Sequence, residues 1–491
     1  MEYRLARIPE ASAWLRGEFM PALKRPERPA TVNLPLRKAP VIAEADVLVV
    51  GGGPAGIGAA AGAASAGAGV ILIERYGFLG GTATAALVTC FMSFHTPNIE
   101  RRESSEVAFY PRDHGPAEPV IAGVVEKFLN LLIKRGGAIS PSMETGYVVS
   151  FDPEIFKNTA ADLMNHYGVK FLYHAFASGV IGENKIEGVI LETKSGPVVI
   201  KAGVVIDCTG DGDIAALAGA PYEIGRSEDG LCQPMTLLFR ITRFDRDKFA
   251  EYVRKNPDQW NGVQGLKALI EKATVDGKLS LPREDILFFG TPHQEELNIN
   301  STRINRVSGV DVWDLTQAEH EGRQQVHQID LFLREYVPGF GRTYIMQTGI
   351  NVGVRESRRI LGEYVITAGD ILGAAKFDDV IARGTYPIDI HAPDGKGTTL
   401  MRLPKGESYD IPLRCLIPRK INNLLVAGRC ISGTHEALAS YRIIPISMAT
   451  GQAAGVCAAL SAKQNVAPSK IEYQAVQKEL LRQGADLGRD S

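Results

Sequence analysis

The sequence predicts an α/β fold, in which a discontinuous domain of alternating strands and helices carries an inserted domain of mixed α+β structure. Three observations predict it. Residues 45–75 pass from an apolar strand through a glycine turn and an alanine-rich helix into a second apolar strand. Residues 169–210 change to short strands separated by turn residues, which indicates a three-stranded β-meander returning to a central strand. Residues 226–345 are more polar and less periodic, which is typical of an insertion.

The composition argues against several classes of protein. The 54 basic and 56 acidic residues give a formal net charge of -2, so nucleic acid is not an expected partner. The six cysteines include no CxxC pair, so we expect neither a metal site nor a disulfide framework and take a cytoplasmic location as the default. Charges interrupt the N-terminus where a signal peptide needs an apolar core. The apolar stretch 56–73 breaks at Gly67, so no membrane span is expected.

Helical spacing and end signals predict helices at 120–137, 152–168, 316–336 and 447–462. A chain of 491 residues is long enough for two or three domains. The predicted divisions are an N-terminal arm at 1–40, a discontinuous dinucleotide-binding domain at 41–100, 151–225 and 410–465, a substrate or cap domain at 101–150 and 226–409, and a C-terminal helix or tail at 466–491.

A phosphate-binding turn is predicted where Gly51, Gly53 and Gly56 form GxGxxG between the first strand and the helix. The first glycine allows the tight turn, the second lets the backbone approach a pyrophosphate, and the third lets helix and strand pack closely. The helix N-terminus adds unpaired N–H groups and a favourable dipole. Glu74 ends the second strand, 18 residues after Gly56, where its carboxylate can accept hydrogen bonds from a ribose diol. FAD and NAD would both satisfy this turn.

Two distant segments favour FAD. Residues 205–219 form an apolar strand ending in Thr-Gly-Asp-Gly-Asp, and residues 423–455 form another strand that ends in glycine before a helix rich in small residues. A plain NAD dehydrogenase does not require such segments far from the glycine turn. FAD lies extended across its domain, so distant strand ends must meet its pyrophosphate, ribitol and ring.

From residue 45 to 462 the chain resembles FAD-dependent oxidoreductases of the glutathione reductase-like class, and most closely the broad FAD-dependent oxidoreductase family, whose members often lack an assigned substrate. The resemblance rests on GGGPAG with Glu74, FLGGTAT (78–84), DCTGDGD (207–213), GVRESRRILGEYVITAGD (353–370) and AGRCISGTHEALASYRIIPISMATGQAAG (427–455). It implies a Rossmann-like FAD-binding domain with the β-meander, and FAD as the cofactor.

The resemblance also implies where the cofactor lies. It places the 80–83 loop beside the flavin phosphate and ribitol, and the 209–213 loop over the adenosine. Gly428 and Arg429 would lie near the pyrophosphate and ribitol, and the start of the last long helix would face the pyrimidine edge of the ring. The predicted cofactor-binding residues are Gly51, Gly53, Pro54, Ala55, Gly56, Glu74, Arg75, Gly80, Gly81, Thr82, Ala83, Thr209, Gly210, Asp213, Gly428, Arg429, Pro445, Met448 and Gly451.

The catalytic candidates are His435, Tyr441, Arg442, His391 and Arg355. The first three lie between a flavin-contacting strand and helix. Arg442 is the first choice for orienting a carboxylate or other anion, with an internal salt bridge as the alternative. His435 and His391 are candidates for proton transfer, with structural hydrogen bonding as the alternative. The resemblance implies that the segment of Arg355 shapes the active-site side of the domain interface; the alternative is a helix face joined by ion pairs.

The predicted function is an FAD-dependent oxidoreductase or dehydrogenase that acts on a small organic substrate by direct hydride transfer. A second GxGxxG and a redox CxxC pair are absent, so the flavin itself should exchange electrons with that substrate. Carboxylate- and hydroxyl-bearing substrates both stay open. The alternatives are a flavin monooxygenase and a flavin-bound electron-transfer or assembly protein. The sequence does not distinguish O2, quinone, NAD(P)H and a carrier protein as the second electron donor or acceptor. It is compatible with a homo-oligomer.

Overall fold

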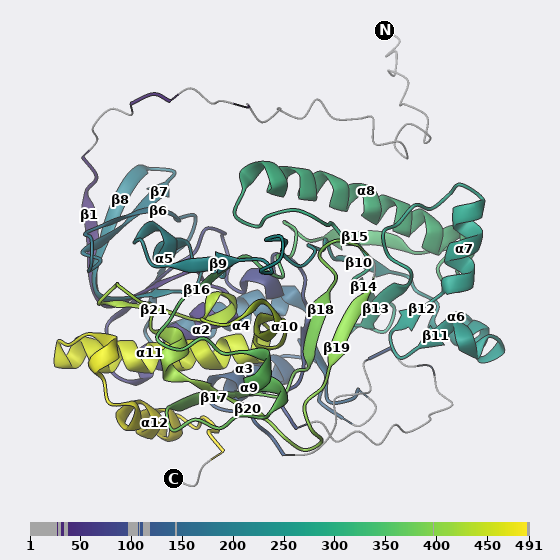
Figure 1. Cartoon of the computed structure of the whole chain (residues 1–491). Helices are drawn as coiled ribbons and strands as arrows, with labels where there is room; N and C mark the ends of the chain where they lie inside the picture. The colour runs from purple at the N-terminus through teal and green to yellow at the C-terminus, as the bar shows by residue number, and fades with distance from the viewer. Residues whose placement is uncertain are drawn as a thin grey trace.

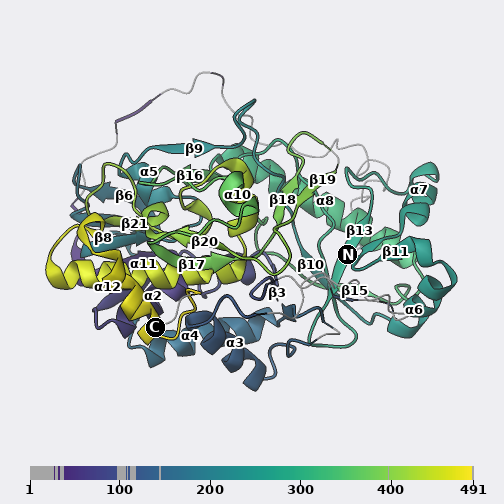
Figure 2. The same cartoon turned by 60° about the horizontal axis from the view of Figure 1, so that its bottom comes forward.

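The computed structural model describes residues 27, 31–33, 38–96, 107, 109–110, 118–142, 145–395 and 397–488. Most of the predicted N-terminal arm at 1–40, and most of 97–117, lie outside these residues. The described residues form two hydrophobic cores, each packed around its own sheet. Figures 1 and 2 show the two sheets side by side, with the strand pair β18 (Ile388–His391) and β19 (Thr398–Met401) between them.

The first sheet has the order β5-β2-β1-β8-β7-β6, and β21 pairs with β8 outside this path. Neighbours among β1, β2, β5, β8 and β21 are parallel, whereas β6, β7 and β8 form the predicted antiparallel meander. Because the parallel strands all end at one edge, their following loops meet there. The bounds are β1 Val41–Val50, β2 Val70–Ile73, β5 Lys170–Leu172, β6 Phe176–Ile181, β7 Gly188–Thr193, β8 Gly196–Asp207 and β21 Leu424–Val426.

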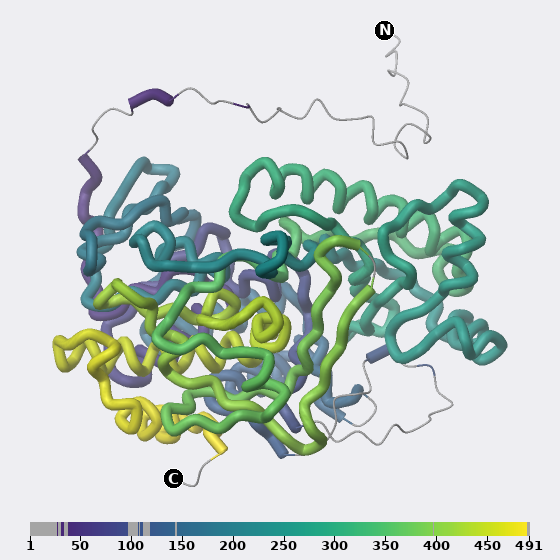
Figure 3. Tube along the Cα trace, in the orientation of Figure 1, coloured from purple at the N-terminus to yellow at the C-terminus, as the bar shows by residue number. Residues whose placement is uncertain are grey.

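Two helices of small residues lie against each other beside this sheet. Helix α2 (Pro54–Ser65) follows the first strand, and helix α11 (Ile444–Gln464) returns from the far end of the chain, as the yellow and purple tube segments in Figure 3 show. A Cβ on Gly58 would lie 2.1 Å from the Met448 carbonyl oxygen. The helices therefore approach at backbone distance, which only glycine permits.

Helix α11 is also long and apolar enough to cross a membrane by length and composition alone. In the structure, 89% of its apolar window is buried. Such burial is what a core helix of a folded domain shows, so the sequence pattern is weak support for a span.

The same core includes α3 (Val124–Lys134) and α4 (Pro153–His166), which confirm the helices predicted at 120–137 and 152–168. Asp152 caps α4 by accepting hydrogen bonds from the Glu154 and Ile155 amides at 2.8 and 3.1 Å. The apolar face of α3 packs into the first core and not into the second.

The second sheet is antiparallel, with the order β11-β12-β13-β14-β10-β15. Its core is rich in aromatic rings, among them Phe249, Phe288 and Phe340. Helix α8 (Val312–Tyr336) contains the helix predicted at 316–336 and begins one turn earlier, where Asp311 caps it. The other bounds are β10 Phe239–Thr242, β11 Trp260–Asn261, β12 Gln264–Gly265, β13 Ile286–Gly290, β14 Leu297–Ile299, β15 Tyr344–Thr348, α6 Arg246–Lys255 and α7 Lys267–Val275.

Short strand pairs and helices make up the remaining elements. The pairs are β3 (Cys90–Phe91) with β4 (Val149–Ser150), β9 (Tyr222–Ile224) with β16 (Arg358–Ile360), β17 (Val380–Gly384) with β20 (Tyr409–Pro412), and β18 with β19. The remaining α-helices are α5 Asp213–Leu217, α9 Ala368–Leu372, α10 His435–Tyr441 and α12 Tyr473–Arg482.

One interpretation of the charged segment 353–370 was a helix face joined by ion pairs. This prediction is wrong over the charged part of the segment. Residues 358–360 form strand β16, and the helix α9 begins only at Ala368. The charges that alternate in sequence do form an ion pair, between Glu356 and Arg359 at 2.5 Å, but both side chains are buried. A local pattern of alternating charges cannot distinguish an exposed helix face from a buried network.

Candidate functional site

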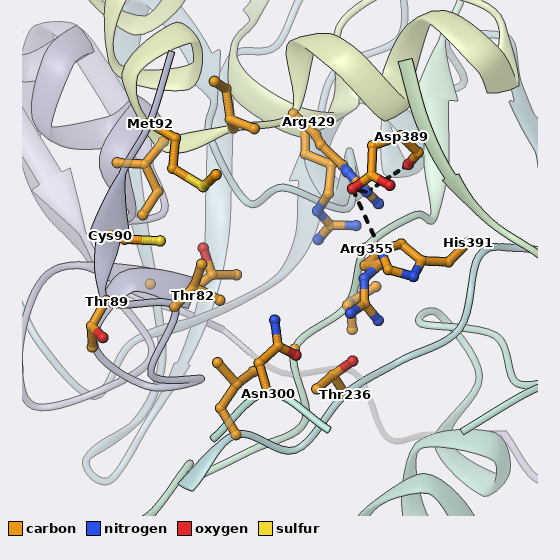
Figure 4. A pocket seen from close by; sticks show the side chains of 18 of the residues that line it. Thr82, Thr89, Cys90, Met92, Thr236, Asn300, Arg355, Asp389, His391 and Arg429 are labelled. Atoms are coloured by element: carbon orange, nitrogen blue, oxygen red, sulfur yellow. Dashed lines mark hydrogen bonds and ion pairs between the residues drawn. The ribbon is translucent and has the colours of Figure 1, made fainter. Parts of the chain in front are cut away.

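A large cavity lies between the two cores, with a volume of about 1880 Å³ and walls from both sheets. Figure 4 shows Cys90 and Met92 on one wall, and Asp389, His391 and Arg355 across the space from them. Pockets for drug-sized ligands usually measure about 300–1,000 Å³. The cavity can therefore hold an extended dinucleotide and a further small molecule.

The glycine turn forms one end of the cavity. Gly51, Gly53, Pro54 and Ala55 line it at the N-terminus of α2. Gly51 has a φ of 99°, and a Cβ there would lie 2.5 Å from the Cys208 carbonyl oxygen. Gly56 does not line the cavity; a Cβ on it would lie 1.8 Å from the Gly51 carbonyl oxygen. The turn leaves space for a ligand at helix N–H groups, which suits a phosphate.

Glu74 lies beside the turn, directly after β2, and Arg75 lines the cavity next to it. The two Glu74 carboxylate oxygens accept hydrogen bonds from the Gly52 amide at 2.7 Å and the Tyr76 amide at 2.9 Å. Burial raises the pKa of Glu74, while these amides and Arg75 oppose the rise. Each oxygen keeps a lone pair, so the carboxylate can also accept from two hydroxyl groups.

The 80–83 loop is split between cavity and core. Gly81 and Thr82 line the cavity, whereas Gly80 and Ala83 do not. Gly80 has a φ of 119° and donates its amide to the Gly52 carbonyl oxygen at 2.8 Å. This hydrogen bond fixes the loop against the glycine turn.

The ends of β8 and β21 bring the next predicted group together. Thr209, Gly210 and Asp213 line the cavity with Gly428 and Arg429. The Arg429 guanidinium donates to Asp211 and to the Ser357 hydroxyl, each at 2.7 Å. Arg429 is thus held in place across three segments that lie far apart in the sequence.

The first turn of α11 reaches the cavity through Ile443, Ile444 and Ser447. Met448 is fully buried. Of the cofactor candidates in this helix, the structure places Pro445, Met448 and Gly451 in the packed interior and not on the cavity wall.

The five catalytic candidates separate into two groups. Arg355, His391 and Arg442 line the cavity, whereas His435 and Tyr441 lie behind its wall. The His435 Nδ1 atom is 2.8 Å from the Glu356 carboxylate, and the Tyr441 hydroxyl donates to the Ile431 carbonyl at 3.1 Å.

Asp389 links two of the candidates that reach the cavity, His391 and Arg442. Its carboxylate lies 3.5 Å from His391 Nε2 and 3.8 Å from an Arg442 nitrogen, and it accepts a hydrogen bond from the Tyr386 hydroxyl at 3.1 Å. Arg442 also donates to the Asp389 carbonyl at 3.0 Å. Arg442 therefore forms an internal salt bridge with Asp389, which was the alternative role predicted for it from the sequence.

Burial and the neighbouring charges shift the pKa values of Asp389, His391 and Arg355. Burial alone would raise the pKa of Asp389, but the His391 hydrogen bond and the Arg442 and Arg355 charges lower it well below its usual range. Burial, together with the Arg355 charge, lowers the pKa of His391 to about 3. Burial, together with the Arg442 charge, lowers the pKa of Arg355 to about 9. These shifts favour an ionised Asp389 and a neutral His391 at neutral pH.

Sequence reasoning did not find Asp389, Arg303 or Asn300, which all line the cavity. Asp389 could have been found, because it precedes His391 by two residues in a strand and side chains alternate along a strand. Arg303 and Asn300 follow β14 in a segment without a periodic signal. Only the packing of the second core brings them to the cavity.

Comparison with known proteins gives one match to a family. A model described as FAD dependent oxidoreductase matches residues 46–480. No protein with a curated description matches the chain in sequence. The matched residues include the whole cavity wall, the second hydrophobic core and all of the first core except Leu487.

Several solved structures are similar to the chain at low identity. One is a geranylgeranyl bacteriochlorophyll reductase-like protein from Thermoplasma acidophilum, at 16% identity and a TM-score of 0.43, covering 90% of this chain and 84% of that one. Another is p-nitrophenol 4-monooxygenase from Pseudomonas putida DLL-E4, at 9% identity and a TM-score of 0.43, covering 90% and 85%. A third is a flavin-dependent brominase, at 12% identity and a TM-score of 0.43, covering 89% and 83%.

Proposed function

The chain belongs to the family of FAD dependent oxidoreductases, and we propose that it oxidises or reduces a small organic substrate by direct hydride exchange with FAD. The observation that carries the proposal is a neutral imidazole beside an ionised carboxylate, His391 and Asp389, on the wall of the cavity that also holds the glycine turn. Hydride transfer at carbon needs a group that takes or gives the accompanying proton.

The residues at the turn fit FAD. Gly51 and Gly53 line the cavity at the N-terminus of α2, Glu74 keeps free lone pairs, and Arg429 lines the same cavity. These groups would hold the adenosine and diphosphate. FAD supplies the hydride acceptor or donor when it is bound, and the chain supplies position and proton transfer.

His391 is the proposed proton acceptor. With one ring nitrogen directed at Asp389, the other carries the lone pair of a neutral imidazole. The Nδ1 atom lies 3.4 Å from both an Arg303 nitrogen and the Thr398 hydroxyl. Hydrogen bonds of this length are weak, so this nitrogen is available to a substrate hydroxyl.

We propose that the two cores have different roles: residues of the first core bind FAD, and residues of the second core bind the substrate. The cofactor candidates all come from segments that pack in or beside the first core, whereas Arg303 and Asn300 come from the second-sheet segment. Because α3 and β17 pack in the first core, we favour a substrate domain centred on 235–354 over the broader ranges 101–150 and 226–409.

Replacing His391 with asparagine tests the proposed acid-base role. An active substrate is first found by anaerobic bleaching of the flavin against a panel of acids, alcohols and sugars. We expect His391→Asn to retain its FAD and to lose about 100-fold or more in kcat, the scale of a general base. His327→Asn, on the exposed face of α8, is the control and should keep wild-type kcat.

The pH profile of the wild-type enzyme adds a second readout. Since the pKa of His391 is lowered from 6.5 to about 3, the neutral base persists on acidification well below its ordinary range. The rate should therefore not fall as the pH drops through 6.5. A rate that falls there, and that becomes pH-independent in His391→Asn, would contradict the neutral ring.

A further inference from the structure

Two guanidinium groups on the cavity wall have no carboxylate partner among the described residues. Arg303 is only 5% exposed and donates to the carbonyls of Gly395 and Gly397 at 3.2 Å. Arg355 donates to the Pro234 carbonyl at 2.6 Å. Neither lies within ion-pair distance of an Asp or Glu in the part of the chain that the structure describes.

The surrounding charges do not compensate for them. Arg442 faces Asp389 at 3.8 Å, and Arg283 is paired with Asp285 at 2.7 Å. His391 is neutral, and Glu284, which also lines the cavity, is exposed and makes no ion pair with these arginines among the described residues. Asp389 attracts both Arg303 and Arg355 from beyond ion-pair distance, and Asp285 and Glu284 attract Arg303 in the same way. Among the described residues, neither guanidinium group therefore has a carboxylate in direct contact.

A buried charge is costly unless a counter-charge accompanies it. Here the unpaired groups face a cavity, so the counter-charge can arrive with a ligand. Figure 4 shows that the side chains of Asn300 and Thr236 also point into this space. A carboxamide and a hydroxyl can both donate hydrogen bonds, which suits a ligand rich in oxygen acceptors.

The position of the two arginines favours the substrate over the cofactor diphosphate. The N-terminus of α2 and Arg429 already provide donors at the turn. Arg303 instead contacts the loop between β18 and β19, and one of its nitrogens lies 3.4 Å from His391 Nδ1. An anion held there would lie beside the proposed proton acceptor.

We propose that Arg303 and Arg355 form an anion subsite, and that the substrate of this enzyme carries a carboxylate which they bind. The inference rests on the proposed function and assigns its substrate class. Arg442, which the sequence favoured for this role, instead positions Asp389. A guanidinium fork binds a planar carboxylate through two parallel hydrogen bonds, which fixes orientation as well as charge.

Titrations of the FAD-loaded protein test this subsite. The probes are malonate and succinate, their neutral diamides, and inorganic phosphate, each followed by the change in flavin absorbance. We expect the dicarboxylates to cause a saturable change and the diamides to cause none. Arg303→Met and Arg355→Met should each weaken dicarboxylate binding by about tenfold or more. Arg355→Lys keeps the charge and should bind between wild type and Arg355→Met.

Arg342→Met is the matched control, because Arg342 is exposed and lies outside the cavity wall. It should bind the dicarboxylates as the wild type does. Equal binding of diamides and dicarboxylates would overturn the subsite, as would unchanged affinity in both methionine variants. Phosphate that binds more tightly than either dicarboxylate would overturn the carboxylate assignment. Loss of FAD from the variants would assign the arginines to the cofactor diphosphate instead.

The result is separable from the proposed function. Bound flavin that dithionite reduces and air reoxidises shows a redox-competent cofactor, whatever anion binds. If the flavin cycles and no carboxylate binds, the subsite fails and the proposed function stands. If carboxylates bind at Arg303 and Arg355 but no substrate bleaches the flavin, the subsite stands and the proposed function fails.

Discussion

Alanine at position 451 is expected to cost the chain its bound FAD and about 3 kcal/mol of stability, the upper range for an overpacked core. A Cβ on Gly451 would lie 2.0 Å from the Ala55 carbonyl oxygen and 2.8 Å from its carbonyl carbon. Both atoms belong to the backbone of the first turn of α2, which cannot rotate away as a side chain can. The turn would have to move, and with it the N–H groups that face the cavity.

Urea unfolding and the ratio of flavin to protein absorbance measure the two effects. Gly341→Ala is the control, because the nearest atom to its new Cβ is 3.9 Å away and its φ is not positive. The control should keep wild-type stability and flavin content. If Gly451→Ala also kept both, the close contact of α2 and α11 would not be what holds the turn in place.

Replacing Glu356 with glutamine should destabilise the fold by about 3–5 kcal/mol, the cost of breaking a buried ion pair from one side. Glu356 is fully buried and faces Arg359 at 2.5 Å and His435 at 2.8 Å, and it accepts from the Gln233 amide at 3.0 Å. Glutamine has nearly the same shape, but it removes the negative charge and turns an NH2 group toward existing donors. Arg359 would then be a buried cation without its main partner.

Chemical denaturation at neutral pH measures this loss. Glu251→Gln is the control, because the Glu251–Lys255 pair is exposed and should contribute nothing measurable. A Glu356→Gln protein as stable as the wild type would show that the buried network adds no net stability. The network lies next to Arg355 in sequence, so we also expect the variant to bind dicarboxylates more weakly.

Local patterns predicted the elements around the glycine turn well. Short stretches of sequence indicate the turn from Gly51 to Gly56 and the strand that precedes Glu74, and α2 forms as expected. The meander from β6 to β8 was also predictable, because alternation and turn residues are local signals. These features require no knowledge of distant contacts.

The opposite wall of the cavity depends on contacts between distant segments, which no local pattern indicates. Arg303 and Arg355 are 52 residues apart in sequence, yet both line one cavity. His435 was a reasonable candidate by residue type, but only the fold shows that it faces the buried Glu356. The helix face predicted for the charged segment 353–370 failed for the same reason. The elements that surround Glu356 and Arg359 bury them, and the local sequence does not record those elements.

The central claim is that the cavity between the two cores binds FAD and lets it exchange electrons. The most direct measurement is the absorbance spectrum of the purified chain after incubation with FAD and removal of the excess. We expect folded protein that retains FAD in equimolar amount, with a flavin band that dithionite bleaches anaerobically and air restores. Folded protein that stays colourless and retains no FAD would contradict the account.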